Sequence, residues 1–416
     1  MRIRDLWESP ALKATVVFGT SGVAFAGGNL LLARALPAPR YALVALAVAL
    51  VQLSVPLAPA GLDGVVNRRK RAPRSGLFAR VLLSSSVVAV AAAAAGGLFY
   101  RLEPALMAML LACTLAGGLN LVAGARYQSL GRLPRALGIT QAPNYSLALA
   151  GVLAVALGLR QPWFPCAVLA AGYALPAAFG WTTLARQGLL GDPAGDRLRW
   201  VEGFAIAGLS AAVVLLIQLE RLLIPRLLTL PDLATFAVLS AIAGSPYRML
   251  QMGVGYTMLP RLRSAATAGE RRRLLAREGT VAALVVIAAS LVVWFVTPLV
   301  VRWFLAGRYD LPRALILAAL VTGGFKVASA FAASVNVALG STTQLGLLNA
   351  SSWGAIAIAV AAAAVGARWG LTGVVYGVGL GWLTHAVAAA CLALPHLGDA
   401  PARAAPEPPP LPSAEM

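Results

Sequence analysis

The chain has few charged residues, few cysteines and few histidines for its 416 residues. Asp, Glu, Lys and Arg together make up 12%, and only 15 residues are acidic. Cys113, Cys166 and Cys391 each fall inside an apolar stretch, without the spacing of a disulfide or a metal site. His385 and His396 form no dyad, and paired carboxylates, a nucleotide-binding glycine loop and a Ser/His/Asp arrangement are missing. We therefore expect neither an enzyme nor a bound cofactor or metal.

Long hydrophobic runs fill the sequence instead. Hydrophobic residues make up 59% of the chain and the mean hydropathy is +0.79, well above the soluble range. A helix needs ~20 apolar residues to cross ~30 Å of hydrocarbon. The sequence therefore predicts an all-α polytopic membrane protein with about twelve transmembrane helices. The predicted spans are residues 11–33, 41–62, 78–99, 104–123, 137–159, 163–184, 201–224, 233–258, 280–304, 312–339, 345–367 and 371–394.

Basic residues are concentrated in every second predicted loop. The intervening loops are shorter and contain fewer basic residues. Short cytoplasmic loops carry the excess of positive charge in membrane proteins. The alternation therefore predicts a multi-pass inner-membrane protein with both termini in the cytoplasm. The basic loops follow spans two, four, six and eight, with residues such as Arg68, Lys70, Arg74, Arg132, Arg186, Arg271, Arg272 and Arg273.

The net charge of +19 is also compatible with nucleic-acid binding. We reject that interpretation, because basic loops beside apolar spans are typical of membrane topology and attract anionic membrane lipids. No cleavable signal peptide is expected at the first span. Residues 398–416, rich in proline and alanine, are predicted to form a disordered cytoplasmic tail.

The two halves of the chain resemble each other. A shift of 192 residues places Arg34 on Arg226 and Pro39 on Pro231, and a shift of 209 places Gly131 on Gly340. Because each half holds an even number of spans, both enter the membrane in the same direction, as a parallel repeat. We predict two six-helix lobes, residues 1–190 and 191–397, related by a pseudo-two-fold axis. Such lobes enclose a cleft that rocking opens to each side in turn.

Four short motifs resemble a known family: residues 34–41 between spans one and two, Gly61-Leu62-Asp63, Pro260-Arg261-Leu262, and the FLAGRY stretch at 304–309. They are similar to those of the Wzx-type lipid-linked oligosaccharide flippases and polysaccharide exporters of the multidrug/oligosaccharidyl-lipid/polysaccharide (MOP) superfamily. The chain departs from the family pattern at Pro37 and Ala42, where glycines are commoner.

This resemblance implies a function and a set of partners. The cargo would be a polyprenyl-diphosphate-linked oligosaccharide, flipped from the cytoplasmic to the periplasmic leaflet for the synthesis of O-antigen, capsule or exopolysaccharide. Implied partners are that lipid-linked glycan, membrane lipids, a polysaccharide polymerase and glycosyltransferases. A cleft that carries such a cargo needs fixed positive charge for the diphosphate and hydrogen-bonding groups for the sugar.

Two cations lie near the centres of predicted spans, Arg248 in the eighth and Lys326 in the tenth. A cation at the bilayer centre costs ~2.5–3.5 kcal/mol on insertion scales, so it is expected to face a polar interior. We interpret both as cleft residues that bind an anionic headgroup, and Arg221 in the seventh span as a third. The alternative is an internal ion pair that fixes helix packing, with Glu220 as the available partner.

Glu220 is also the candidate for coupling to a proton or sodium gradient, although a structural role fits it as well. Amides that suit sugar hydroxyls, or equally hydrogen bonds between helices, recur in the same spans. They are Asn29, Gln52, Gln218 and Gln251. Helix-disrupting residues occur at matching places in the second and eighth spans: Pro56, Pro59, Gly244 and Pro246. Broken helices at matching positions of two repeats point to a transport site.

Three alternatives remain at this stage. A cation-coupled drug exporter of the same superfamily would share the fold, although the scarcity of intramembrane acids disfavours it. A membrane glycosyltransferase or O-antigen polymerase would need catalytic groups on sizeable external loops, and the loops here are short. A binding or scaffold protein is the third alternative.

Overall fold

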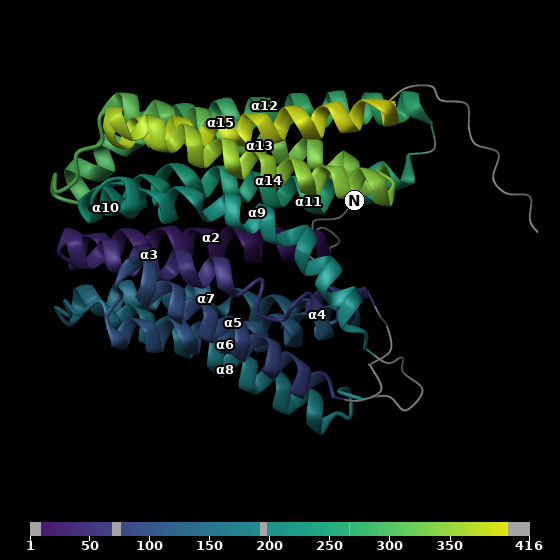
Figure 1. The fold of residues 1–416 in the computed structure, drawn as a ribbon, viewed down its shortest axis with the longest axis horizontal. Coiled ribbons are helices and arrows are strands. Elements are labelled where there is room, and N and C mark those ends of the chain that lie inside the picture. The colour runs from purple at the N-terminus through teal and green to yellow at the C-terminus, as the bar shows by residue number, and fades with distance from the viewer. Residues whose placement is uncertain (1–9, 69–75, 192–197, 266, 398–416) are drawn as a thin grey trace, which may run out of the picture.

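The computed structural model describes residues 10–68, 76–191, 198–265 and 267–397, and within them the chain is helical throughout, with no strand (Figure 1). The predicted tail at 398–416 lies outside the described residues. Along the chain the elements are α2 (Pro10–Ala35), α3 (Ala38–Ser54), α4 (Leu62–Arg68), α5 (Leu77–Tyr100), α6 (Pro104–Ser129), α7 (Leu133–Ala156), α8 (Trp163–Arg186), α9 (Trp200–Leu227), α10 (Leu230–Leu239), η1 (Ser240–Gly244), α11 (Ser245–Ser264), α12 (Ala268–Leu299), η2 (Val300–Phe304), α13 (Arg313–Leu339), α14 (Thr342–Gly366), η3 (Ala367–Trp369), α15 (Gly370–Ala393) and η4 (Leu394–Leu397).

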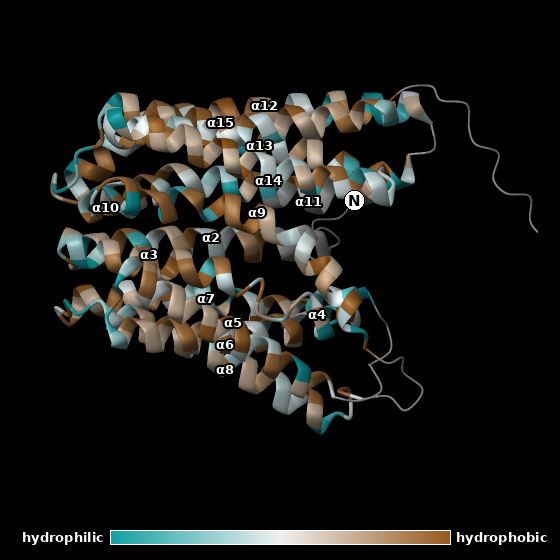
Figure 2. Cartoon of the chain, viewed as in Figure 1, coloured by the Kyte–Doolittle hydropathy of each residue, from teal (hydrophilic) through white to brown (hydrophobic). Residues whose placement is uncertain are grey.

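Nine of the described stretches are long and apolar enough to cross a membrane, and one of them, Thr342–Leu397, contains both α14 and α15. The remaining two predicted spans fall outside the nine. One is α7, and the other, predicted at 41–62, is the shorter apolar helix α3, which ends at Ser54. Figure 2 shows the hydrophobic residues along the helix shafts and most hydrophilic ones near the helix ends. The fold class predicted from hydropathy, an all-α polytopic membrane protein, is confirmed.

Two groups of helices lie side by side, α2 to α8 below and α10 to α15 above in Figure 1. We call them the first lobe and the second lobe, and we count α9, which crosses between them, with the second lobe. At one end, where α2 turns into α3 and η2 leads to α13, a single apolar core joins both lobes through residues such as Leu36, Tyr41, Leu233 and Tyr309. We call this the sealed end. It is the end that topology predicts to be periplasmic.

At the other end, which carries Arg68, Arg132, Arg186 and Arg261 and is called the basic end, the core divides. One cluster lies in the first lobe, around Val81 and Trp181, and another lies in the second lobe, around Met258 and Leu262. The lobes are therefore packed against each other chiefly at the sealed end.

Helix α9 crosses between the lobes (Figure 1). Its first turns touch the first lobe, where Gly203 faces Ala60 and Gly61. Its last turns accept a hydrogen bond from Tyr100 at the Leu222 carbonyl and donate one from Arg226 to the Phe99 carbonyl, so they are bonded to α5 of the first lobe. The helix also packs on α10, α14 and α15 of the second lobe. Gly61 has φ +75°, and a Cβ there would lie 2.0 Å from the Gly203 carbonyl oxygen. Only glycine satisfies both the backbone angle and this close approach.

One contact is repeated in the two lobes. In the first lobe the Cys113 thiol on α6 donates to the Cys166 carbonyl on α8 at 3.8 Å. In the second lobe the Thr322 hydroxyl on α13 donates to the Val375 carbonyl on α15 at 3.3 Å. Both pairs are 53 residues apart, and they are related by the 209-residue shift seen in the sequence. The repeat thus extends to the packing between helices.

Helix α12 begins at Ala268, twelve residues before the predicted span. Thr267 and Glu270 form a capping box there, in which each side chain accepts a hydrogen bond from the backbone of the other residue. Because this cap satisfies the first backbone donors, the helix extends through the basic stretch Arg271–Arg273 before it reaches its apolar part. The prediction placed this start too late.

Candidate functional site

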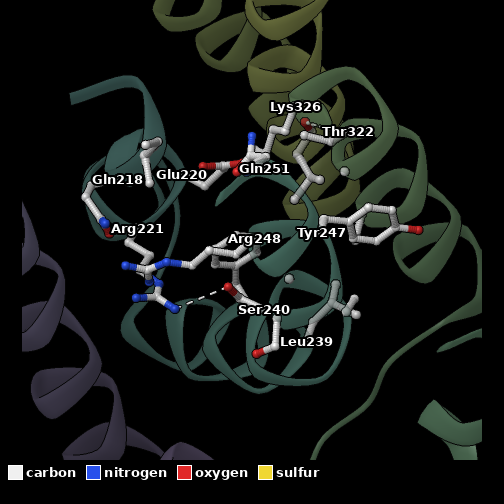
Figure 3. Close-up of a pocket in the computed structure, with 18 of the residues that line it drawn as sticks. Gln218, Glu220, Arg221, Leu239, Ser240, Tyr247, Arg248, Gln251, Thr322 and Lys326 are labelled. Atoms are coloured by element: carbon white, nitrogen blue, oxygen red, sulfur yellow. Dashed lines mark hydrogen bonds and ion pairs between the residues drawn. The ribbon is translucent and has the colours of Figure 1, made fainter. Parts of the chain in front are cut away.

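A cavity lies at the junction of the lobes (Figure 3). The second lobe supplies most of its lining, from α9, α10, η1, α11, α13 and α15, and the first lobe supplies Phe25 from α2 and Gln52 from α3. The cavity has a volume of about 100 Å³ and is partly open. That volume holds a few water molecules or one phosphate-sized group. A bulky cargo therefore requires the lobes to separate.

Glu220 and Lys326 form an ion pair on one wall of the cavity, with Nζ and Oε1 2.5 Å apart. The glutamate side chain is 3% exposed and the lysine side chain 22% exposed. The lysine Nζ also lies 5.7 Å from the centre of the Trp382 ring. Lys326 therefore fits both interpretations drawn from the sequence. It has an internal ion-pair partner, and it also lines the cavity.

Arg221 and two glutamines link the lobes through hydrogen bonds. The Gln218 amide nitrogen donates to Gln52 Oε1 at 3.0 Å, and Arg221 donates to the same oxygen at 3.5 Å. The other terminal nitrogen of Arg221 donates to Ser240 Oγ at 3.2 Å, the dashed line in Figure 3. Gln52 belongs to the first lobe and the other three belong to the second, so any separation of the lobes at this level breaks the two bonds to Gln52.

Arg248 faces the open part of the cavity. It is exposed, and its guanidinium lies 5.6 Å from the centre of the Phe25 ring on the opposite lobe. It lies close enough to Arg221 for the two charges to repel each other. No carboxylate in the described part of the chain pairs with Arg248. Two adjacent guanidinium groups with a single carboxylate, Glu220, in the same cavity are suited to an anion.

The remaining predicted site residues divide into two sets. Gln251 lines the cavity with Gln52 and Gln218, whereas Asn29 does not: it is 3% exposed and donates to the Phe25 carbonyl of its own helix.

The helix breaks lie where the prolines are. After Ser54 the chain makes a series of turns through Pro56 and Pro59, and η1, a π-helical turn, ends at Gly244 just before Pro246. Of these four residues, only Gly244 lines the cavity.

Several residues of the site were not predicted. Phe25, Ser240, Tyr247 and Thr322 line the cavity, and no charge or break in the sequence marks them. His385 is also unanticipated, since it forms hydrogen bonds with Ser329 at 2.6 Å and Ser352 at 2.8 Å in the core of the second lobe. The periodicity of a helix reveals which residues share a face, but not which neighbouring helix that face meets.

The charges at the cavity do not balance. Arg221, Arg248 and Lys326 face a single anion, Glu220, which leaves an excess of two positive charges. Among the described residues, no group of three or more His, Cys, Asp or Glu lies where it could hold a metal ion. The arrangement is suited to binding a negatively charged group between two lobes rather than to covalent chemistry.

No family model and no curated protein matches the sequence of this chain. Its fold is similar to an inward-facing multidrug resistance MATE family transporter of the MOP superfamily, with a TM-score of 0.58, 12% identity, and coverage of 92% of this chain and 94% of that one. The described residues therefore have the fold of a MOP-superfamily membrane transporter.

Two further solved structures are similar at lower scores. The eukaryotic MATE transporter AtDTX14 has a TM-score of 0.49 and 13% identity over 92% of this chain and 87% of its own. The Vibrio cholerae MATE transporter VcmN, in its bent form, has a TM-score of 0.40 and 14% identity over 93% of this chain and 98% of its own. The solved neighbours are transporters and not enzymes.

Proposed function

We propose that this chain is an alternating-access transporter that flips a polyprenyl-diphosphate-linked oligosaccharide from the cytoplasmic to the periplasmic leaflet. The observation that carries the proposal is the excess of two positive charges at the cavity between the lobes. Guanidinium and ammonium groups are the side chains that bind phosphate oxygens most strongly, and the neighbouring Gln52, Gln218 and Gln251 can bond sugar hydroxyls.

The arrangement of the two cores supports a rocking mechanism. The lobes share one apolar core at the sealed end and have separate cores at the basic end. With the topology predicted from the loops, this is a carrier ready to load from the cytoplasm. Since the cavity is only about 100 Å³, loading widens it, and release requires the sealed end to part.

A cation-coupled exporter of small organic molecules is the second candidate, and the solved neighbours favour it. The transporter with the same fold and a TM-score of 0.58 is described as a multidrug resistance protein. In this chain Glu220 would be the coupling residue, and its bond to Lys326 would have to break for a proton or a sodium ion to bind. An excess of positive charge would then exclude cationic drugs and select anionic or neutral ones.

A reconstituted assay distinguishes the two candidates. Liposomes containing the protein receive either a fluorescent polyprenyl-diphosphate disaccharide, with dithionite as an impermeant quencher, or a small anionic dye with an imposed proton gradient. We expect the lipid to be flipped, and Arg248→Ala and Lys326→Ala each to slow flipping at least ~10-fold, since a lost charge-assisted bond is worth ~1.5–3 kcal/mol.

The control is Arg368→Ala, which removes an exposed arginine remote from the cavity. Full flipping by the double variant Arg248→Ala/Lys326→Ala would remove the anionic-cargo proposal. Gradient-dependent transport of the dye, with no flipping of the lipid, would establish the second candidate instead.

A further inference from the structure

Four arginines from three separate segments gather at the sealed end. Arg34 lies in the last turn of α2, Arg40 in the first turn of α3, Arg160 between α7 and α8, and Arg308 between η2 and α13. These segments form part of the left side of the molecule in Figure 1. The first three arginines belong to the first lobe and Arg308 belongs to the second. None of them contributes to the central cavity.

A second cavity opens among them, with a volume of about 300 Å³. Arg160 and Arg308 line it from opposite lobes, together with Tyr309 and the α2–α3 turn at 35–38. The lining contains no carboxylate. Asp310, the nearest acid in sequence to Arg308, forms no ion pair or hydrogen bond with any described residue. The cavity is therefore positively charged and large enough for a phosphate or diphosphate group.

Backbone contacts hold the arginines in place. Arg308 donates to the Arg34 carbonyl at 2.8 Å, and Arg40 donates to the Arg160 carbonyl at 3.1 Å. Arg34 lies over the Phe304 ring at 5.3 Å. The guanidinium of Arg160 bonds to no described residue. Since each guanidinium has five N–H donors, most donors at this site remain for a ligand.

Two of these contacts, Arg308 with Arg34 and Arg34 with Phe304, join the two lobes, and Tyr309 adds a third. The Tyr309 hydroxyl donates to the Ala33 carbonyl at 3.1 Å, and its ring meets that of Tyr41 edge-on. Burial raises the pKa of Tyr309 to about 12, so the hydroxyl keeps its proton at physiological pH. When the sealed end parts, Arg160 and Arg308 must move away from each other. The cavity therefore exists only while this end is closed.

We propose that this arginine-lined cavity is a phosphate-binding site that holds the sealed end closed. An anion bridging Arg160 and Arg308 binds only the state in which the lobes meet, and it shifts the carrier toward that state in proportion to its occupancy. The group is a phosphate or diphosphate, carried by a lipid headgroup of the outer leaflet or free in solution. The site is distinct from the cargo cavity and does not depend on the identity of the cargo.

The experiment measures binding and lobe position together on the full-length protein. Spin labels are placed at Arg186→Cys and Ser264→Cys, exposed positions of opposite lobes at the basic end, in a chain with Cys391→Ser. Pyrophosphate is titrated in detergent with calorimetry and distance measurement in parallel. We expect binding that weakens with salt, and a distance distribution that shifts toward the wider separation.

Three variants sharpen the result. Arg160→Gln should weaken pyrophosphate binding at least ~10-fold and abolish the distance shift, and Arg160→Lys should retain part of both. Arg160 is chosen because its side chain forms no lobe contact of its own. Arg368→Gln, an equal loss of charge at another exposed arginine of the sealed end, should change neither.

The source of the phosphate is determined in nanodiscs, first without pyrophosphate and then after it is added. A distance shift in phosphatidylglycerol, which is anionic, but not in phosphatidylcholine, whose choline balances its phosphate, identifies the phosphate of an anionic lipid. A shift only on adding pyrophosphate identifies a free phosphate. The proposal is overturned if neither source shifts the distances, or if Arg160→Gln behaves like Arg368→Gln. Because no cargo is transported in these measurements, their failure is separate from a failure of the flipping assay.

Discussion

The two lobes repeat one helical plan but differ in packing and in charge. The third helix of the first lobe, α5, buries seven residues, among them Val81, Ser85 and Gly96. Its counterpart in the second lobe, α12, buries only Val293 and Thr297. All four charged residues of the central cavity belong to the second lobe, whereas the first lobe contributes one amide and one aromatic ring.

This difference follows from the two sequences. Helix α5 carries a run of alanines and glycines that lets neighbouring helices approach closely, and α12 carries bulky residues such as Leu291, Val292 and Phe295, which are exposed. In a bilayer those residues face lipid. We infer that the first lobe is a compact support and that the second lobe contains the adjustable parts of the carrier.

The largest expected effect tests the tight packing of the first lobe. A Cβ on Gly118 would lie 2.1 Å from Ser85 Oγ and 2.9 Å from Ala58 Cβ, whereas nothing lies within 4 Å of a Cβ on Gly324 of α13. Gly118→Val should lower the free energy of unfolding by ~3 kcal/mol, and Gly324→Val should change it little. Thermal unfolding in detergent measures the stability of both variants. Equal losses of stability would contradict the difference in packing between the lobes.

An intermediate effect tests the charges of the second lobe. Glu220→Gln leaves the Lys326 ammonium without its partner and should lower stability by ~2 kcal/mol, less than for a fully buried pair because the lysine is partly exposed. The double variant Glu220→Gln/Lys326→Met should recover most of the loss. If the double variant is no more stable than Glu220→Gln, the lysine charge is not what makes the single change costly.

The smallest effect tests how α12 is attached. The Tyr247 hydroxyl and Ser290 Oγ lie 2.6 Å apart and join α11 to α12. Tyr247→Phe and Ser290→Ala should each cost ~1 kcal/mol and speed hydrogen exchange in α12, with little change in α5. Tyr376→Phe, at an exposed tyrosine, is the control. Unchanged exchange in α12 would show that this bond does not anchor the helix.

Much of the fold could be predicted from the sequence because hydropathy and positive charge are local signals. The break after Ser54 was also visible, since proline acts on the backbone around it, whereas at Gly244 the helix continues through a π-helical turn without a break. The late start assigned to α12 had a signal that was overlooked: a threonine three residues before a glutamate at 267–270.

Contacts between helices were harder to predict. Asn29 and Gln52 looked equivalent in sequence, yet only Gln52 lines the cavity, because the face on which each amide lies is set by packing. The pairing of Lys326 with Glu220 joins residues 106 positions apart, and the sequence indicated only that a partner was available. Tyr247 reaches α12 across α13, where Gly323 leaves room for its ring.

The glycine contact between α9 and the turn before α4 has a mechanical consequence. No side chain separates Gly61 from Gly203, so the two backbones lie in direct contact and can serve as a pivot. The end of α9 at Leu227 lies ~36 Å along the helix from this fulcrum, at 1.5 Å per residue, so a tilt of ~10° moves it by ~6 Å. A small angular change at one end of this lever is thus enough to part the other.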